Sequence, residues 1–173
     1  MAFDLLSKVL RIFMNFNFEK QNSHPAVILL GRVFLSLIFI VSGLFKILSW
    51  DQNIQFMQSL NISNAPLLLV PAIVIEILCG LSILLGYKTQ LGATLLFLYL
   101  IPVTLTFHKF WALEGVDKQI QWVNFMKNLS IMGGLAILSG FGAGRASIDA
   151  IFPSRRSVKT YTKPEIVKPK KIA

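Results

Sequence analysis

The chain has 173 residues, of which 54% are hydrophobic and 14% are charged, and its formal net charge at pH 7 is +9. Its mean hydropathy of +0.65 is too high for an ordinary soluble domain, so the composition predicts an integral membrane protein. This length allows several spans in one bundle but hardly a second folded domain. The single cysteine, Cys79, excludes an intrachain disulfide and a Cys-x-x-Cys redox pair.

Residues 1–25 are predicted to form an amphipathic arm at the membrane interface. Apolar residues between Phe3 and Met14 recur at nearly helical spacing, with Asp4, Lys8 and Arg11 between them, as in helices that lie in the interface. A cleaved signal peptide is the alternative, but these charges interrupt the apolar run and no clear small-residue cleavage site follows. A retained arm is therefore favoured.

The first predicted span covers residues 26–46, close to the 20 or so apolar residues that cross a bilayer. It contains one internal cation, Arg32. A charge within hydrocarbon is energetically unfavourable unless it is paired with another group. Its polar and small residues recur in steps of three and four, which places them on one face of a helix. That face should contact protein, and its members are Arg32, Ser36, Phe39, Gly43 and Lys46.

Three further spans follow. The second, residues 66–85, carries Glu76 at its middle, and a short turn at 86–90 makes the third, residues 91–107, its antiparallel neighbour. Residues 47–65 are expected to form an interfacial loop that has room for a short helix. The fourth span, residues 122–141, is the weakest, since polar residues lie in its first half; a polar connection over 112–121 precedes it.

A basic tail over residues 145–173 is expected to be disordered beyond about residue 153. The two tails and the turn at Lys88 hold twelve of the seventeen Lys and Arg residues, which predicts that both termini face the cytoplasm. Because these bases flank spans, attraction to anionic lipid explains them better than nucleic-acid binding. The predicted organisation is an arm (1–25), a four-helix transmembrane domain (26–144) and a tail.

The spans bring polar residues toward one mouth on the outer side. Glu76 would lie near the midplane, about 15 Å from either end of its helix, and a carboxylate there must be paired or protonated. Arg32 is the favoured partner because a guanidinium forms buried ion pairs best, while Lys46 or Lys127 would approach from the outer half. The predicted pocket is closed toward the cytoplasm by this pair and comprises Arg32, Lys46, Glu76, His108, Trp111, Lys127 and Asn128.

Each of these residues also has a purely structural interpretation. The ion pair could only fix helix packing, the lysines could be interfacial anchors, Trp111 could belong to the aromatic belt, and His108 could simply bond water. Cys79 is interpreted as a packing residue. No metal site is predicted, because the His, Glu and Cys residues lack ligand spacing.

Four ordered segments resemble the DoxX family of small bacterial membrane proteins. They are G-R-x-F-L-S-L-I-F-I-x-S-G-x-x-K-I from Gly31, I-E-I-L-C-G-L-S-I-L-L-G-Y from Ile75, F-H-K-F-W from Phe107 and M-K-N-L-x-I-M-G-G from Met126. The resemblance spans about residues 31–144 and implies a four-helix inner-membrane bundle with a loose link to oxidoreductases, although distant relatives act as chaperones or cargo receptors. It carries over no catalytic residue. The positions that match its pattern are Arg32, Gly43, Lys46, Glu76, Gly80, His108, Trp111, Lys127 and Asn128.

Two functions are expected from these observations. In the first, the pocket binds a quinone or lipid, and the chain is an accessory membrane subunit of an oxidoreductase complex. Because it has no flavin fingerprint, haem ligand pair or cysteine couple, the electrons must come from the substrate or from a membrane or periplasmic redox partner. In the second, it is a non-enzymatic scaffold or chaperone for other membrane proteins. Transport is disfavoured because no inverted repeat is visible. Homo-oligomers are compatible with both functions.

Overall fold

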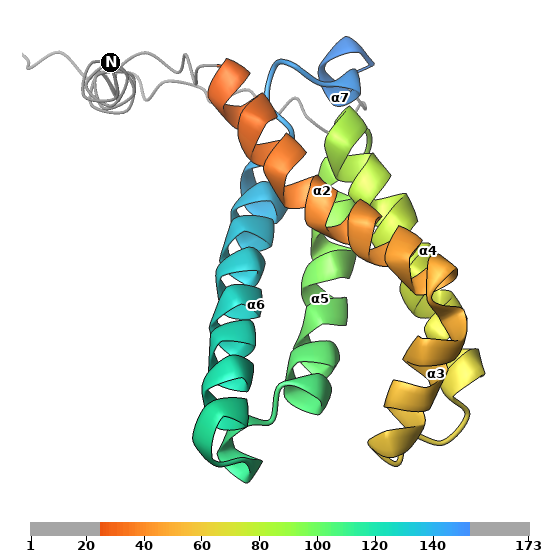
Figure 1. The fold of residues 1–173 in the computed structure, drawn as a ribbon. Helices are drawn as coiled ribbons and strands as arrows, with labels where there is room; N and C mark the ends of the chain where they lie inside the picture. The colour runs from red at the N-terminus through yellow and green to blue at the C-terminus, as the bar shows by residue number, and fades with distance from the viewer. Residues whose placement is uncertain (1–24, 153–173) are drawn as a thin grey trace, which may run out of the picture.

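The computed structural model describes residues 25–152. Helices joined by short turns make up this part of the chain, and it contains no strand (Figure 1). Three segments are long and apolar enough to cross a membrane: Pro25–Leu48, Ala65–Leu85 and Thr89–Ala112. The prediction of an all-α membrane protein is thus confirmed. The arm predicted for residues 1–25 lies almost wholly outside the described residues. The helices are α2 (Pro25–Leu48), α3 (Trp50–Ser59), α4 (Ala65–Leu85), α5 (Thr89–Phe107), the 3-10 helix η1 (Phe110–Ala112), α6 (Gly115–Phe141) and α7 (Ile148–Ile151).

Helices α2 and α4 pack tightly against each other through two glycines. A Cβ atom at Gly43 would lie 2.6 Å from Ile77 Cγ1, and one at Gly80 would lie 2.9 Å from Ile40 Cγ1. The absence of side chains at these positions therefore lets the backbones approach closely, as in other membrane helix pairs. The predicted protein-facing stripe of α2 is confirmed, since Arg32, Ser36, Phe39 and Gly43 are all buried.

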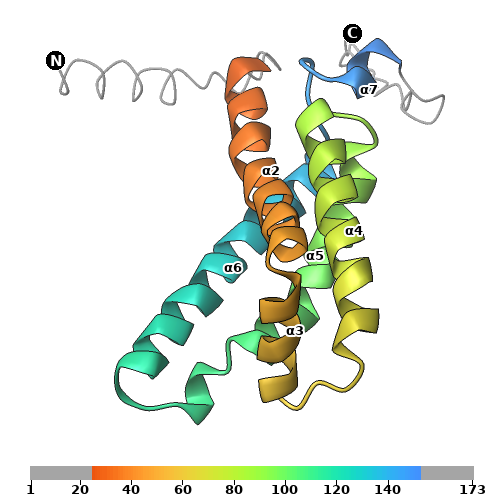
Figure 2. The same cartoon turned by 45° about the vertical axis from the view of Figure 1, so that its right-hand side comes forward.

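The register of this pair places the end of α2 halfway along α4, because Gly43 meets Ile77. The chain then continues as α3 beside the first half of α4 (Figure 2), where Met57 packs with Ala65, Leu69 and Ile73. The segment predicted as an interfacial loop thus holds a ten-residue helix. As a result, α2 and α3 together accompany the whole length of α4.

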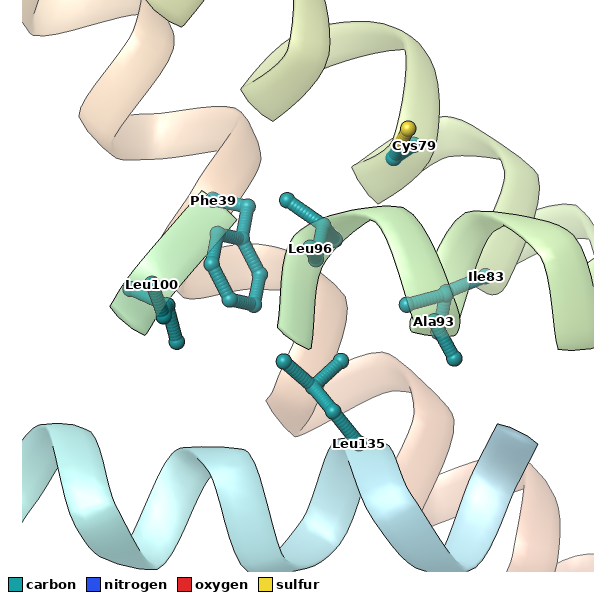
Figure 3. Close-up of a cluster of buried hydrophobic side chains, with 7 residues drawn as sticks. All are labelled: Phe39, Cys79, Ile83, Ala93, Leu96, Leu100 and Leu135. Carbon is teal, nitrogen blue, oxygen red and sulfur yellow. The ribbon is translucent and has the colours of Figure 1, made fainter. Parts of the chain in front are cut away.

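Helix α5 is the antiparallel neighbour of α4, as predicted, and it joins the main core. Seven side chains from four helices fill this core (Figure 3): Phe39, Cys79, Ile83, Ala93, Leu96, Leu100 and Leu135. The Cys79 side chain lies among these apolar groups, as expected of a packing residue.

Helix α6 is 27 residues long and begins at Gly115, so the polar connection predicted over 112–121 is wrong for most of its length. Acidic, basic and amide residues in this part alternate with Val116, Ile120 and Trp122, a mixture that a partly exposed helix tolerates. Figure 1 shows α6 running beside α5. Leu135 of α6 belongs to the same core cluster as Ala93, Leu96 and Leu100 of α5. Several large apolar side chains of α6 are exposed on its other side, and Phe141 is the most exposed of them, at 88%.

The residues after α6 fold back over the end of the bundle that holds the start of α2. Asp149 Oδ1 accepts a hydrogen bond of 2.8 Å from the Lys88 backbone nitrogen, and Oδ2 accepts one of 3.1 Å from that of Thr89. Asp149 therefore caps the first turn of α5. The tail predicted from residue 145 thus has its first eight residues on the folded bundle, while residues 153–173 lie outside the described part of the chain.

Candidate functional site

A polar cluster lies where α2, α4 and α5 meet, midway along α4. Lys46 Nζ donates to both oxygens of Glu76, at 2.9 and 2.8 Å, and to Ser42 Oγ at 2.6 Å. The Tyr99 hydroxyl donates to Glu76 Oε1 at 2.8 Å. We call Ser42, Lys46, Glu76 and Tyr99 the Glu76 cluster. The cluster pairs one anion with one cation, and this attraction offsets the free-energy cost of placing a carboxylate in apolar surroundings.

Local sequence explains how the cluster forms. Ser42 and Lys46 are four residues apart on α2, and so lie on the same face. Gly43, between them, brings α2 close enough to α4 for Lys46 to reach Glu76, since its missing Cβ would lie 3.5 Å from Glu76 Cβ. The Glu76 side chain is only 5% exposed, whereas that of Lys46 is 23% exposed. Ser42 and Tyr99 are also partly exposed, so the buried Glu76 carboxylate is surrounded by three side chains that each reach the surface of the bundle.

Arg32 does not pair with Glu76, and the favoured prediction for this residue is wrong. Arg32 and Lys46 are fourteen residues apart on one helix, which is about 21 Å along its axis. Arg32 is 1% exposed and donates four hydrogen bonds to backbone oxygens. The acceptors are Ile83 O at 2.9 Å, Leu84 O at 2.7 Å, Ala143 O at 3.1 Å and Ala146 O at 2.6 Å.

The surroundings of Arg32 explain why it needs no carboxylate contact. The last carbonyl groups of a helix have no partner within the helix and carry the negative end of its dipole. Arg32 binds two such groups at the end of α4 and two carbonyl groups of the non-helical segment after α6. Gly86 makes room, since a Cβ atom there would lie 2.6 Å from Arg32 Nη2. We call this junction the Arg32 clamp.

The remaining predicted site residues lie in other groups. His108 Nδ1 is 2.8 Å from Gln121 Oε1 of α6, and Asn128 Nδ2 donates to Thr104 Oγ1 at 3.0 Å. His108 is nine residues from Tyr99, about 13 Å along α5. His108 therefore lies away from the Glu76 cluster along the bundle, and the residues of the predicted funnel make separate contacts between helices.

Lys127 and Trp111 also lie apart from the cluster. Lys127 is exposed and donates to Asn124 of its own helix at 3.0 Å. Trp111 is 54% exposed and packs edge-on against Phe110, at a centroid distance of 5.1 Å. A cavity of about 540 Å³ lies nearby, lined by Phe110, Gly115, Lys118, Gln119 and Trp122. None of the predicted site residues lines it.

Two members of the Glu76 cluster were missed by sequence reasoning. Ser42 carried a usable signal, because it precedes Lys46 by one helical turn. Tyr99 carried a weaker one, as a polar side chain within a long apolar span. No group of three or more His, Cys, Asp or Glu residues that could hold a metal occurs between residues 25 and 152. The cluster itself offers hydrogen-bonding groups for the polar head of a ligand.

Comparison with known proteins gives several relatives of this chain. It is 31% identical over 132 residues to the inner membrane protein YphA of Escherichia coli, a match that covers 76% of this chain and 94% of YphA. It is 33% identical over 124 residues to the inner membrane protein YqjF of the same organism, which covers 72% and 90%. The ER-derived vesicles protein ERV29 of Saccharomyces cerevisiae is 31% identical over 77 residues, covering 44% of this chain and 25% of ERV29.

No solved structure matches the chain. The family model described as DoxX matches residues 27–109, a range that contains α2, α4, α5 and every member of the Glu76 cluster. Together with relatives matched over nine-tenths of their length, this shows that the chain belongs to the DoxX family of membrane proteins.

Proposed function

We propose that this chain is an accessory membrane subunit of an oxidoreductase complex, in which the Glu76 cluster binds the polar head of a lipophilic molecule, a quinone or a lipid. The observation that carries the proposal is the cluster itself. An ion pair with two further hydroxyl groups lies among apolar helices, and the side chains of Lys46, Ser42 and Tyr99 are each partly exposed. Ionisable groups within membrane spans are often functional.

The proposal includes four spans in the inner membrane, with both termini in the cytoplasm. Helix α6 would be the fourth span, because its 27 residues extend about 40 Å, more than the hydrocarbon thickness. Polar groups in its first half are partly satisfied by α5, as the bond between Asn128 and Thr104 illustrates. The names of YphA and YqjF support the inner membrane, and the distribution of Lys and Arg supports the orientation.

The chemistry of the cluster suits an oxygen-bearing head group with an apolar tail. Such a head can exchange hydrogen bonds with Glu76, Ser42 or Tyr99, while its tail remains between the apolar helices and lipid. A quinone supplies electron transfer when bound. The protein's part would be to position the head group and exclude water, and a partner would supply the electrons. The separation of His108 from the cluster leaves it outside this binding site.

The test is extraction and ligand analysis of the purified chain. We expect native protein in mild detergent to retain a quinone or an oxygen-rich lipid, detected by absorption and mass spectrometry, and the variant Glu76→Gln to lose it while keeping its helical content. Lys127→Gln is the matched control, because it also removes one charge but from an exposed residue whose hydrogen bond is to Asn124 of its own helix. Equal ligand content in all three proteins would contradict the proposal.

A scaffold or chaperone is the second candidate function, and the exposed apolar side of α6 favours it. Leu129, Ile137 and Phe141 are all more than half exposed, and a Cβ atom at Gly133 or Gly140 would meet nothing within 4 Å. A helix of another membrane protein could pack closely there. A purified chain that carries no ligand but retains a partner protein through α6, and loses it when Gly133 is replaced by leucine, would favour this function.

A further inference from the structure

The hydrogen atoms of the Glu76 cluster are almost all in use. The Lys46 ammonium has three hydrogens, and it makes three bonds, to Ser42 Oγ, Glu76 Oε1 and Glu76 Oε2. Tyr99 has one, and it is donated to Glu76 Oε1. A ligand oxygen that only accepts hydrogen bonds, such as a carbonyl, therefore finds no free donor on either Lys46 or Tyr99.

The Glu76 carboxylate and the Ser42 and Tyr99 oxygens can still accept hydrogen bonds, and the Ser42 hydroxyl can still donate one. A carboxylate has about four acceptor positions, and three are filled: two at Oε1 and one at Oε2. Glu76 Oε2 can therefore accept another hydrogen bond. The Ser42 hydroxyl accepts from Lys46 and donates to no acceptor among residues 25–152. Both oxygens lie next to the same nitrogen, at 2.8 Å for Oε2 and 2.6 Å for Ser42 Oγ.

From this inventory we infer that the Glu76 cluster selects a hydroxyl head group over a carbonyl head group. A hydroxyl can donate to Glu76 Oε2 and accept from Ser42, whereas a carbonyl can only accept from Ser42. The inference rests on the proposed function and narrows its ligand to a quinol, the reduced form of a quinone, or a lipid alcohol. The additional bond is made to a charged acceptor, and such bonds correspond to about tenfold or more in affinity.

The experiment compares decylubiquinol with decylubiquinone, which differ only in the oxidation state of the ring. Binding to purified native chain in detergent is measured by calorimetry under nitrogen. We expect the quinol to bind at least about tenfold more tightly. Dioctanoylglycerol is then added as a competitor: displacement of the quinol supports a lipid alcohol as a ligand of the same hydroxyl site, and no displacement supports a quinol.

Three variants test the assignment of donors and acceptors. Glu76→Gln replaces an acceptor by an amide that can donate, so the preference for quinol should fall to about one or reverse. Ser42→Ala removes a donor that both head groups can use and frees the Lys46 hydrogen that was bonded to Ser42 Oγ, which both can use instead, so the two affinities should change alike and their ratio should stay near the native value. Lys127→Gln, outside the cluster, should leave the ratio unchanged. A fall in the ratio of the two affinities for Glu76→Gln alone cannot arise from general loss of folding.

The outcomes separate this inference from the proposed function. If both forms bind, if binding depends on Glu76, and if the quinone binds equally or more tightly, the hydroxyl preference is wrong and the ligand site stands. If neither form binds saturably, or if Glu76→Gln leaves both affinities unchanged, the site is wrong and the inference falls with it.

Discussion

Replacement of Arg32 by lysine tests whether the Arg32 clamp depends on charge or on geometry. The variant keeps a cation at this buried position but changes a planar group with five donors into an ammonium with three. The guanidinium contacts four carbonyl groups that come from two separate segments, with distances of 2.6–3.1 Å. A single nitrogen cannot lie within bonding distance of all four, because the acceptors surround three different nitrogen atoms.

The expected loss follows from the number of bonds that lysine cannot make. At least one charge-assisted hydrogen bond disappears, and each contributes about 1.5–3 kcal/mol. A carbonyl group that is left buried without a donor adds a similar cost, partly relieved where water reaches this end of the bundle. We therefore expect Arg32→Lys to lower the free energy of unfolding by about 2–4 kcal/mol.

The assay is reversible unfolding in mixed micelles, followed by circular dichroism as the fraction of denaturing detergent is increased. Arg145→Lys is the control, because Arg145 lies in the same segment but is exposed, and its stability should stay within about 0.5 kcal/mol of the native chain. If Arg32→Lys were as stable as the control, the positive charge alone would be sufficient and our interpretation of the clamp would be refuted.

Two more predictions concern helix packing and helix capping. Gly80→Ala should destabilise the chain by about 1–3 kcal/mol, because the new Cβ would lie 2.9 Å from Ile40 Cγ1 and 3.4 Å from the Ile40 backbone nitrogen; Gly133→Ala, with nothing within 4 Å, should be neutral or slightly stabilising in the same unfolding assay. Asp149→Ala should cost about 0.5–2 kcal/mol, since it removes the cap on α5, and it should increase hydrogen exchange at the Lys88 and Thr89 amides. Unchanged exchange there would contradict the capping role.

Much of the bundle could be predicted from local sequence, because long apolar runs and three-to-four spacing depend on nearby residues alone. The three-to-four spacing of Arg32, Ser36, Phe39 and Gly43 predicted the buried stripe of α2. The importance of Glu76 was predicted because it is a single carboxylate within a long apolar run. The first turns of α6 were not predicted to be helical, because polar and apolar residues are mixed there as they are in a polar connection between helices.

The partners of Arg32 and Glu76 depended on information that the sequence lacks. The prediction favoured Arg32 as the partner of Glu76 and named Lys46 or Lys127 only as groups that approach from the outer half. In the fold, α3 covers the first half of α4, so Lys46 lies level with Glu76. Arg32 could not be assigned because its acceptors are backbone carbonyls, which every residue has, and only the convergence of the end of α4 with the segment after α6 distinguishes these four.

The Arg32 clamp has a consequence for biogenesis. Ala146, one of its acceptors, is made 114 residues after Arg32, which at 5–20 residues per second is a delay of roughly 6–23 s on the ribosome. During that interval the guanidinium can meet the carbonyl groups of Ile83 and Leu84, which are made 51 and 52 residues after it, but not those of Ala143 and Ala146. The clamp is therefore completed only after α6 has been made, and a chain truncated before Ala143 leaves Arg32 with two of its four acceptors.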